Sequence, residues 1–333
     1  MEYMTGELND GTTPYSAFKE NEGKIISIKG AIHNIRDMSD FAFIILRTAR
    51  DTVQCVYSPE FSDYRLADNV AEQASAKITG KVVKSQTRDG SERFELQIHN
   101  IEILSVPAAI PPVVISKKKV NCDLNVDLDF RPVTLRNPSE RAVFKIQEGI
   151  QRGFREYLSG KGFTEIHSPK INFAGAEGGT NVFKLDYFGK TVFLAQSPQL
   201  YKQALVSVYE RVFEIGPVFR AEHHDTSRHL NEYISMDFEM GFIDSFTDIM
   251  EMETGVLKYI MELLKREYAN EVELLKVDIP EIDKIPCIRF KDAKELCVKK
   301  LKNITDMKDF EPEEEAFLGK WAKQQYGSDF LFV

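Results

Sequence analysis

Cysteine is scarce in this sequence, and its placement matches neither a metal site nor a disulfide framework. The four residues Cys55, Cys122, Cys287 and Cys297 are scattered without C-x-x-C spacing. This pattern argues against a structural zinc site and against the disulfide-rich domains of secreted proteins. The apolar runs are short and interrupted by charges, so we expect no membrane-spanning segment. The N-terminus has neither the basic start nor the apolar stretch of a secretory signal, which predicts a cytoplasmic protein.

Positive charge is also in deficit. The sequence contains 43 Lys and Arg residues against 52 Asp and Glu residues, which gives a formal net charge of −9. The deficit is uneven, because residues 1–23 contain five acidic residues and one basic residue, whereas residues 24–106 contain eleven of each. This excludes promiscuous electrostatic binding to nucleic acid but is compatible with a local binding surface in residues 24–106. With 333 residues, the chain is long enough for two domains.

The first expected domain is a small β-barrel. Five runs rich in β-branched residues are separated by Asp, Gly, Ser and Asn, at residues 24–35, 41–49, 52–58, 76–85 and 93–105. One helix is expected at residues 66–75, between the third and fourth runs. This order is typical of an OB-fold, a barrel that often binds oligonucleotides, although any small barrel without a ligand fits the same pattern. We therefore assign residues 24–106 to this domain and residues 1–23 to an N-terminal arm that is expected to be disordered.

A linker is expected at residues 107–130. The stretch VPAAIPPVV, at residues 106–114, contains prolines that cannot join a ladder, and the basic SKKKV follows it. Lys117, Lys118 and Lys119 either contact a phosphate backbone or form a solvated charge run. The next strong signal is a helix with Ser139 as its N-cap and Gly160 near its end. Its apolar stripe consists of Val143, Ile146, Ile150, Phe154 and Leu158.

The second domain, residues 131–333, is expected to be α+β. Strand-like runs TEIHSPKI, FKLDYFG and TVFLAQS are followed by a helix in PQLYKQALVSVYE. Two further runs, RVFEIGPVFRAE and EYISMDFEMGFI, are predicted to form an antiparallel pair of strands. The domain is therefore expected to be built on an antiparallel sheet.

The segment between those last two strands is unusually charged. Arg220 ends the first strand, where its planar guanidinium offers paired donors suited to a phosphate or a carboxylate. Arg228 and His229 lie further along the connecting loop, where they could close over additional phosphates. The alternative is a solvated hairpin tip with surface ion pairs, which contribute little to stability.

Several motifs together resemble the class II aminoacyl-tRNA synthetases. GPVFRAE, followed by RHLNEY, resembles motif 2 of that class, and GFTEIHSPKI resembles motif 1, which forms the dimer interface in the class. FLAQSPQLYKQ and SMDFEM are similar to the aspartyl-tRNA synthetases of the archaeal and eukaryotic type. Each motif alone is weak evidence, but their occurrence in this order is specific. The resemblance extends from the barrel to the last residue.

The resemblance implies an enzyme that activates L-aspartate with ATP and transfers it from aspartyl-adenylate to the 3′ end of tRNA(Asp). By the same resemblance, Arg220 binds the α-phosphate and stabilises the transition state, while Glu222 contacts the nucleotide. Arg228 and His229 hold the outer phosphates. Tyr233 takes the place where the family usually stacks a Phe on adenine; a core aromatic is the alternative for this residue.

The resemblance also implies an aspartate pocket. Lys202 supplies the cation for the side-chain carboxylate of the substrate. Glu177, Ser197, Gln199 and Asp237 hold its α-ammonium group. L-Asparagine in this pocket would leave Lys202 without a counter-charge, which is costly once the site is desolvated.

Two further contacts are implied outside that pocket. In the barrel, Phe43 is expected to stack on an anticodon base, while Gln54 and Glu95 recognise base edges. Considered alone, Phe43 also fits a core position. Pro169 in motif 1 is expected at the interface of a homodimer.

Motif 3 of the class has no counterpart in this sequence, and neither do the late carboxylates that hold Mg²⁺ on ATP. The catalytic domain is therefore expected to be C-terminally incomplete, as a shortened form of a longer enzyme, and the 333-residue chain alone incomplete for catalysis. ATP with Mg²⁺ is the expected co-substrate, with no metal ligands in this chain. The alternatives are a synthetase-derived tRNA-binding or regulatory protein and, with less support, an asparaginyl-tRNA synthetase. The sequence does not decide whether tRNA(Asn) is charged beside tRNA(Asp).

Overall fold

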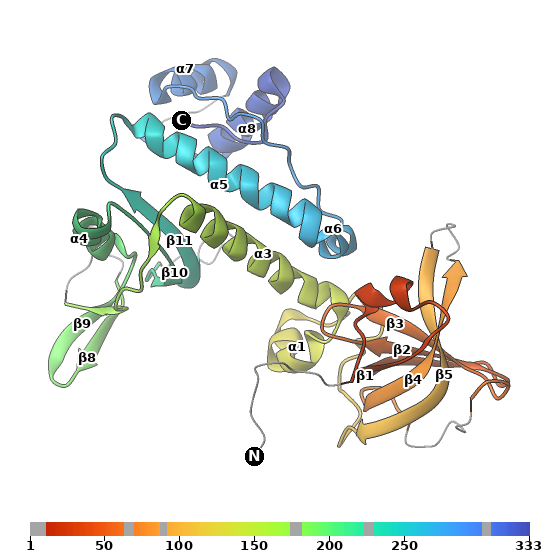
Figure 1. The fold of residues 1–333 in the computed structure, drawn as a ribbon. Coiled ribbons are helices and arrows are strands. Elements are labelled where there is room, and N and C mark those ends of the chain that lie inside the picture. Colours follow the sequence, from red (N-terminus) through yellow and green to blue (C-terminus); the bar gives the residue numbers. More distant parts are fainter. Residues whose placement is uncertain (1–10, 63–69, 87–91, 174–181, 223–229, 302–307) are drawn as a thin grey trace. The chain divides into compact units, whose positions relative to one another are not determined.

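The computed structural model describes residues 11–62, 70–86, 92–173, 182–222, 230–301 and 308–333 (Figure 1). The chain divides into two compact units, Met1–Glu140 and Arg141–Val333. The division falls inside a long helix, α3 (Pro138–Gly160). Each unit is described by itself below.

The first unit contains a closed five-stranded barrel with the strand order β1-β2-β3-β5-β4. All its pairings are antiparallel except β3 with β5, which run parallel. The strands are β1 (Ile25–Asp37), β2 (Ala42–Arg47), β3 (Thr52–Tyr57), β4 (Ser75–Gln86) and β5 (Glu92–Ser105). The predicted OB-fold barrel is thus confirmed. The predicted helix is not found at residues 70–74, and the earlier part of it lies outside the described residues.

The barrel interior is filled by alternate residues of the five strands, as a pleated strand requires. Its fully buried side chains include Ile28, Ile32, Ile44, Leu46, Val53, Ile78, Leu96 and Ile98. Gly80 lies at an irregularity of the β4–β5 ladder, where a Cβ atom would collide with the carbonyl oxygen of Gln97. Only glycine allows the two strands to approach this closely.

The N-terminal arm packs on the barrel, so the expectation of disorder was wrong for its described part. Two short 3₁₀ helices, η1 (Tyr15–Ala17) and η2 (Lys19–Asn21), flank Phe18, which is fully buried in the barrel core. The backbone N–H of Thr13 donates to the carbonyl of Ser27 at 2.8 Å. The physical reason is hydrophobic: burying one aromatic side chain stabilises an otherwise polar segment.

After the barrel come helices α1 (Leu124–Asp129) and α2 (Arg131–Thr134), and then α3 begins. Ser139, predicted as the N-cap of α3, lies in its first turn instead. The N-cap is Asn137, whose Oδ1 accepts from the backbone N–H of Ser139 at 2.9 Å. Proline is favoured at the first helical position, so the helix starts at Pro138, two residues earlier than predicted.

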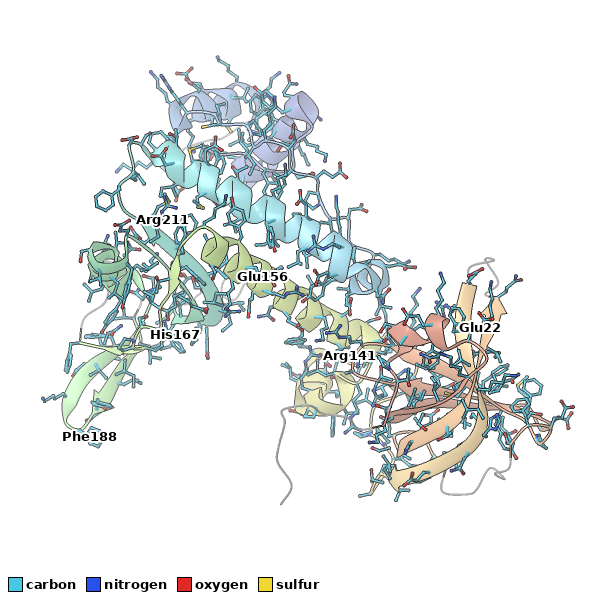
Figure 2. The ribbon with its side chains drawn as sticks, in the orientation of Figure 1. Glu22, Arg141, Glu156, His167, Phe188 and Arg211 are labelled. Atoms are coloured by element: carbon cyan, nitrogen blue, oxygen red, sulfur yellow. The ribbon has the colours of Figure 1, made fainter. Side chains whose placement is uncertain are left out.

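The second unit contains two small sheets. One has the order β11-β10-β6 and the other β7-β9-β8. The predicted antiparallel pair β10 and β11 is confirmed, whereas the short β6 pairs with β10 in parallel. The elements are β6 (Thr164–Glu165), β7 (Ile171–Asn172), β8 (Lys184–Tyr187), β9 (Lys190–Leu194), α4 (Gln199–Tyr209), β10 (Arg211–Phe219) and β11 (Glu232–Met240). Figure 2 labels Phe188, which is 90% exposed at the tip of the β8–β9 hairpin.

Helices α3 and α5 (Phe246–Glu267) lie side by side (Figure 1) and share a core with the β10–β11 sheet. Phe154, Leu158, Phe213 and Leu263 are buried in this core. Of the predicted apolar stripe on α3, Ile146 and Ile150 are partly buried and Val143 is 53% exposed. The burial of the stripe therefore decreases toward the start of the helix.

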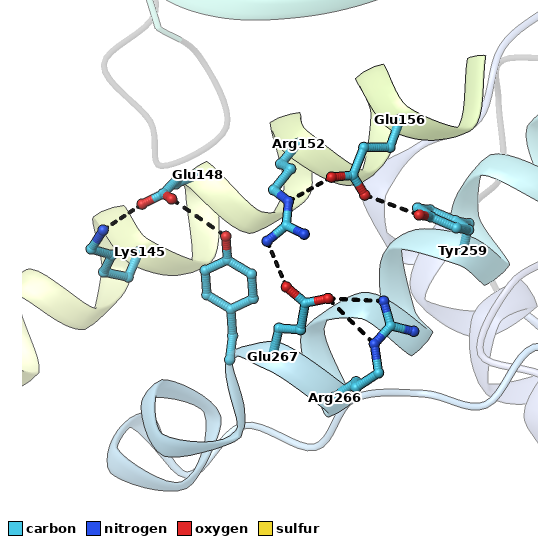
Figure 3. A network of polar contacts seen from close by, with 8 residues as sticks. Lys145, Glu148, Arg152, Glu156, Tyr259, Arg266 and Glu267 are labelled. Carbon is cyan, nitrogen blue, oxygen red and sulfur yellow. Dashed lines mark hydrogen bonds and ion pairs between the residues drawn. The ribbon is translucent and has the colours of Figure 1, made fainter. Parts of the chain in front are cut away.

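Polar contacts beside this core connect α3 to α5 (Figure 3). Arg152 on α3 contacts Glu156 at 2.6 Å and Glu267 on α5 at 2.6 Å, and Tyr259 donates to Glu156 at 2.9 Å. The hydrogen bonds from Arg152 hold the pKa values of both carboxyl groups below their ordinary range.

Helix α6 (Ala269–Leu275) follows α5, and beyond it α7 (Phe290–Lys300) and α8 (Pro312–Tyr326) form a smaller helical module. Ala293, Cys297 and Leu318 are its buried centre. Lys294 on α7 pairs with Glu314 on α8 at 2.6 Å, and both side chains are almost completely buried. Within the described residues, no helix is both long and apolar enough to cross a lipid bilayer.

Candidate active site and anticodon-binding face

The β10–β11 ladder separates a polar face from an apolar one. Glu214 pairs with Asp237, and Gly216 pairs with Ser235. Residues directly opposite in an antiparallel pair project from the same face, so these side chains share one face of the sheet. The intervening residues, Phe213, Ile215, Phe238 and Met240, belong to the core on the other face. The polar face is the candidate active site.

Helix α4 supplies Lys202 to this face. Lys202 is 5% exposed, and its Nζ lies 3.1 Å from Oδ1 of Asp237 and 3.7 Å from Oε2 of Glu239. Ser235 donates to the other oxygen of Asp237. Two carboxylates around one buried cation leave an excess of negative charge, which suits an incoming ammonium group.

The start of α4 brings Ser197 and Gln199 to the same place. Oγ of Ser197 accepts from the backbone N–H of Gln199 at 3.2 Å, and Nε2 of Gln199 donates to Glu239 at 3.4 Å. Of the predicted aspartate-binding residues, Lys202, Asp237, Ser197 and Gln199 are thus brought together. Glu177 lies outside the described residues.

Sequence reasoning missed Glu239 as a member of this site. The available signal was strand alternation, because Asp237 and Glu239 are two residues apart on β11 and must share a face. Strand alternation alone does not identify the residue that faces these two carboxylates. Only the packing of α4 against the sheet shows that Lys202 contacts both.

Arg220 lies one residue beyond the end of β10. Its backbone N–H donates to the carbonyl of Asn231 at 3.0 Å, which continues the β10–β11 pairing into the loop. Glu222 follows, and its N–H donates to the carbonyl of Arg220 at 2.8 Å. Tyr233 is half-buried on the polar face, opposite Val218. The predicted residues Arg228 and His229 lie outside the described part of the chain.

A second candidate site lies on the outer face of the barrel. Phe43 is half-buried, whereas its neighbours on β2, Ala42 and Ile44, are buried, so the Phe43 ring faces outward. Nε2 of Gln54 donates to Oε2 of Glu95 at 2.9 Å. The three predicted residues therefore lie on one surface formed by the neighbouring strands β2, β3 and β5.

Phe43 has a second aromatic beside it. The Phe41 ring meets the Phe43 ring edge-on, with centroids 5.3 Å apart. Such a pair limits the freedom of the Phe43 ring, which lowers the entropy cost of stacking on a base.

Pro169, the predicted interface residue, is exposed in the loop between β6 and β7. Among the described residues, no group of three or more His, Cys, Asp or Glu side chains is placed to hold a metal ion.

Comparisons with known proteins place the chain in a family. Residues 123–333 match the family of class II tRNA synthetases (D, K and N), and residues 26–104 match the OB-fold nucleic acid binding domain. The chain belongs to the class II tRNA synthetases (D, K and N), as its motifs predicted.

Individual proteins of known type give a more specific similarity than the family model does. The chain is 43% identical to the aspartate–tRNA(Asp/Asn) ligase of Deinococcus radiodurans, over 94% of this chain and 70% of that protein. It is 34% identical to the aspartate–tRNA(Asp) ligase of Pyrococcus abyssi, over 95% of this chain and 72% of that protein. Among solved structures, the asparaginyl-tRNA synthetase of Pyrococcus horikoshii, complexed with asparaginyl-adenylate, superimposes with a TM-score of 0.79. That pair is 25% identical and covers 91% of this chain and 70% of the other.

Proposed function

We propose that this chain is an ATP-dependent ligase that joins L-aspartate to tRNA. Its family membership and its identity of 34–43% with aspartate–tRNA ligases support this assignment. The observation that carries the choice of amino acid is the buried Lys202, held by Asp237 and Glu239 on the polar face of the β10–β11 sheet.

The pocket around Lys202 fits both ends of aspartate. The side-chain carboxylate of the substrate pairs with the Lys202 ammonium group, and Asp237 with Ser197 and Gln199 accepts the α-ammonium group. Glu177 is the fourth proposed acceptor. The carboxylate of aspartate accepts a charge-assisted hydrogen bond from the Lys202 ammonium group, whereas the neutral amide of asparagine forms only a weaker one, so L-asparagine binds poorly.

Activation then joins aspartate to ATP. An oxygen of the α-carboxylate attacks the α-phosphorus, the bond to the β-phosphate oxygen breaks, and pyrophosphate leaves. Arg220 neutralises the charge that develops on the α-phosphate oxygens. Tyr233 stacks on adenine, Glu222 contacts the nucleotide, and Arg228 with His229 holds the outer phosphates.

Mg²⁺ accompanies ATP in reactions of this kind. Within the part of the chain that the structure describes, no cluster of His, Cys, Asp or Glu side chains fits the ion.

The barrel supplies tRNA recognition. Phe43 stacks on an anticodon base, and the Gln54–Glu95 pair exchanges its mutual hydrogen bond for bonds to base edges. tRNA(Asp) is the proposed partner. Of the two relatives, one is a ligase for tRNA(Asp/Asn) and the other a ligase for tRNA(Asp). Whether tRNA(Asn) is also charged is therefore a question for experiment.

A cytoplasmic homodimer is the proposed form of the enzyme. Ile146 and Ile150 on α3 and Ile234 and Met236 on β11 line an apolar groove, in which Ile234 is 43% exposed. Together with the exposed Pro169 loop, this groove gives a second copy an apolar surface to cover. Sedimentation at micromolar concentration is expected to give a dimer, and a monomer of the intact protein would contradict it.

Charging assays test the proposed function. The intact enzyme is incubated with ATP, labelled L-aspartate or L-asparagine, and transcripts of tRNA(Asp) or tRNA(Asn). We expect tRNA(Asp) to be labelled when the amino acid is L-aspartate and not when it is L-asparagine. Label from asparagine would indicate an asparaginyl-tRNA synthetase, and binding of tRNA without any charging would indicate the non-catalytic alternative.

A further inference from the structure

Glu214 is a buried carboxylate on the polar face of the β10–β11 sheet. The residue is 2% exposed, and its cross-strand partner is Asp237. The side chain of Asp237 contacts Lys202, whereas that of Glu214 contacts a different lysine, Lys170. Two ion pairs therefore lie next to each other on one face of the sheet.

The Glu214 carboxylate holds the segment of residues 168–170. The backbone N–H of Ser168 donates to both carboxylate oxygens at 3.2 Å, and Oγ of Ser168 donates to Oε2 at 2.7 Å. Nζ of Lys170 donates to Oε1 at 2.5 Å. A buried carboxylate needs such donors to offset its lost hydration. All of these donors come from one segment, so Glu214 fixes its position.

Gly216 leaves room for this arrangement. A Cβ atom at Gly216 would lie 3.1 Å from Oε1 of Glu214 and 3.4 Å from Nζ of Lys170. Any larger side chain would crowd the ion pair, so the strand sequence Glu-Ile-Gly is matched to the 168–170 segment.

The backbone then connects this segment to the candidate pocket. The carbonyl of Lys170 accepts from the N–H of Ala195 at 2.9 Å, and Ala195 lies two residues before Ser197. The carbonyl of Ala195 in turn accepts from the N–H of Phe219 at 2.9 Å, next to Arg220. Phe219 is also paired with Glu232 in the β10–β11 ladder, so its position depends less on the hydrogen bond to Ala195.

We propose that Glu214 is a positioning residue for aspartate binding. It holds the 168–170 segment, which fixes the backbone of Ala195 and thereby the placement of Ser197 and Gln199. The inference rests on the proposed function and adds to it a residue that acts through Ser168 and Lys170.

The test is steady-state pyrophosphate exchange with the intact enzyme. Glu214→Gln keeps the shape of the side chain but removes the counter-charge of Lys170 and one acceptor. We expect the KM for L-aspartate to rise about tenfold and the KM for ATP less than about threefold. Ser168→Ala removes a single hydroxyl donor and is expected to raise the KM for aspartate about threefold.

Two further variants separate positioning from general stability. Glu165→Gln breaks a nearby but more exposed ion pair, in which Glu165 binds Arg155 at 2.9 Å, and is expected to leave both KM values unchanged. In the Glu214→Gln background, Lys170→Met should add almost nothing, because both changes break the same set of contacts.

Several outcomes would overturn the inference. An unchanged KM for aspartate in Glu214→Gln and Ser168→Ala would do so, and so would an equal rise of both KM values with a fall in melting temperature. If Glu214→Gln does not fold, Ser168→Ala decides alone. Absence of aspartate-dependent exchange in the unmodified enzyme would instead contradict the proposed function, and this inference with it.

Discussion

The barrel face and the aspartate pocket each pair a carboxylate with a donor, but in different surroundings. On the barrel, the neutral amide of Gln54 meets Glu95 at 2.9 Å on a partly exposed surface. In the pocket, the ammonium of Lys202 meets Asp237 at 3.1 Å, and Lys202 is almost completely buried.

The difference matches what each site must distinguish. Nucleic acid bases are neutral and are told apart by hydrogen bonds, so partly hydrated amide and carboxylate groups suffice. Aspartate and asparagine differ by one charge, and a charge is discriminated best where water is excluded. We therefore expect changes in the pocket to have larger effects than changes on the barrel.

The largest effect is expected at Arg220. Arg220→Ala removes the cation that we propose for the α-phosphate and should lower kcat by about 10²–10³-fold. Arg220→Lys should restore little, because a point charge does not reproduce the guanidinium fork. The kcat of both variants is measured by aspartate-dependent pyrophosphate exchange.

Arg211 provides the matched control. It lies at the other end of β10, and its Nη1 donates to the carbonyl of Lys161 at 3.1 Å (Figure 2). Arg211→Ala should leave kcat nearly unchanged. An equal loss of kcat in both variants would show that Arg220 acts only on the stability of the strand.

A smaller and separable effect is expected at Phe43. Phe43→Ala removes a stacking surface and should weaken tRNA(Asp) binding by about 1–3 kcal/mol. Filter binding or calorimetry gives the affinity, and aspartate-dependent exchange should stay unchanged. Loss of activation together with tRNA binding would mean that Phe43 supports the barrel core, and the comparison between the two sites would fail.

The smallest expected effect concerns acid stability. Arg152 lowers the pKa values of Glu156 and Glu267 from an ordinary value of 4.5. Depressed carboxyl pKa values stabilise the fold above the unfolded-state pKa, and this contribution is lost as the pH falls through the folded-state values. In Arg152→Met, thermal melts should show a loss of stability at neutral pH that shrinks below about pH 4.5.

The barrel offers a comparison for that prediction. Lys84 and Glu92 form an exposed ion pair at 2.6 Å, in which the hydrogen bond from Lys84 lowers the pKa of Glu92. Lys84 contacts one carboxylate whereas Arg152 contacts two, so Lys84→Met should change the pH dependence less than Arg152→Met. A larger effect at Lys84 would contradict the account.

The barrel could be predicted almost entirely from the sequence, because its signals are local. Each strand carries its own period-2 pattern, whereas the choice of Phe43, Gln54 and Glu95, which come from neighbouring strands, rested on the family resemblance. The exceptions were the helix predicted at residues 66–75, which is not found at residues 70–74, and the N-terminal arm. Phe18 is one aromatic in a polar segment, and only the tertiary core that it enters reveals its role.

The pocket was predictable only in part. Lys202 and Asp237 came from resemblance to the family, and the structure adds that they contact each other. Glu239 and Glu214 were missed because their roles depend on partners 37 and 44 positions away, Lys202 and Lys170. No local pattern specifies which lysine a strand carboxylate will meet.

The most direct test of the central claim is pyrophosphate exchange with L-aspartate and L-asparagine, in the unmodified enzyme and in Lys202→Met. The unmodified enzyme should prefer aspartate by at least about a hundredfold in kcat/KM, and Lys202→Met should lose most of that preference. Lys258→Met, which removes an exposed lysine on α5, should behave like the unmodified enzyme. Equal use of asparagine by the unmodified enzyme, or full preference for aspartate without Lys202, would contradict the account.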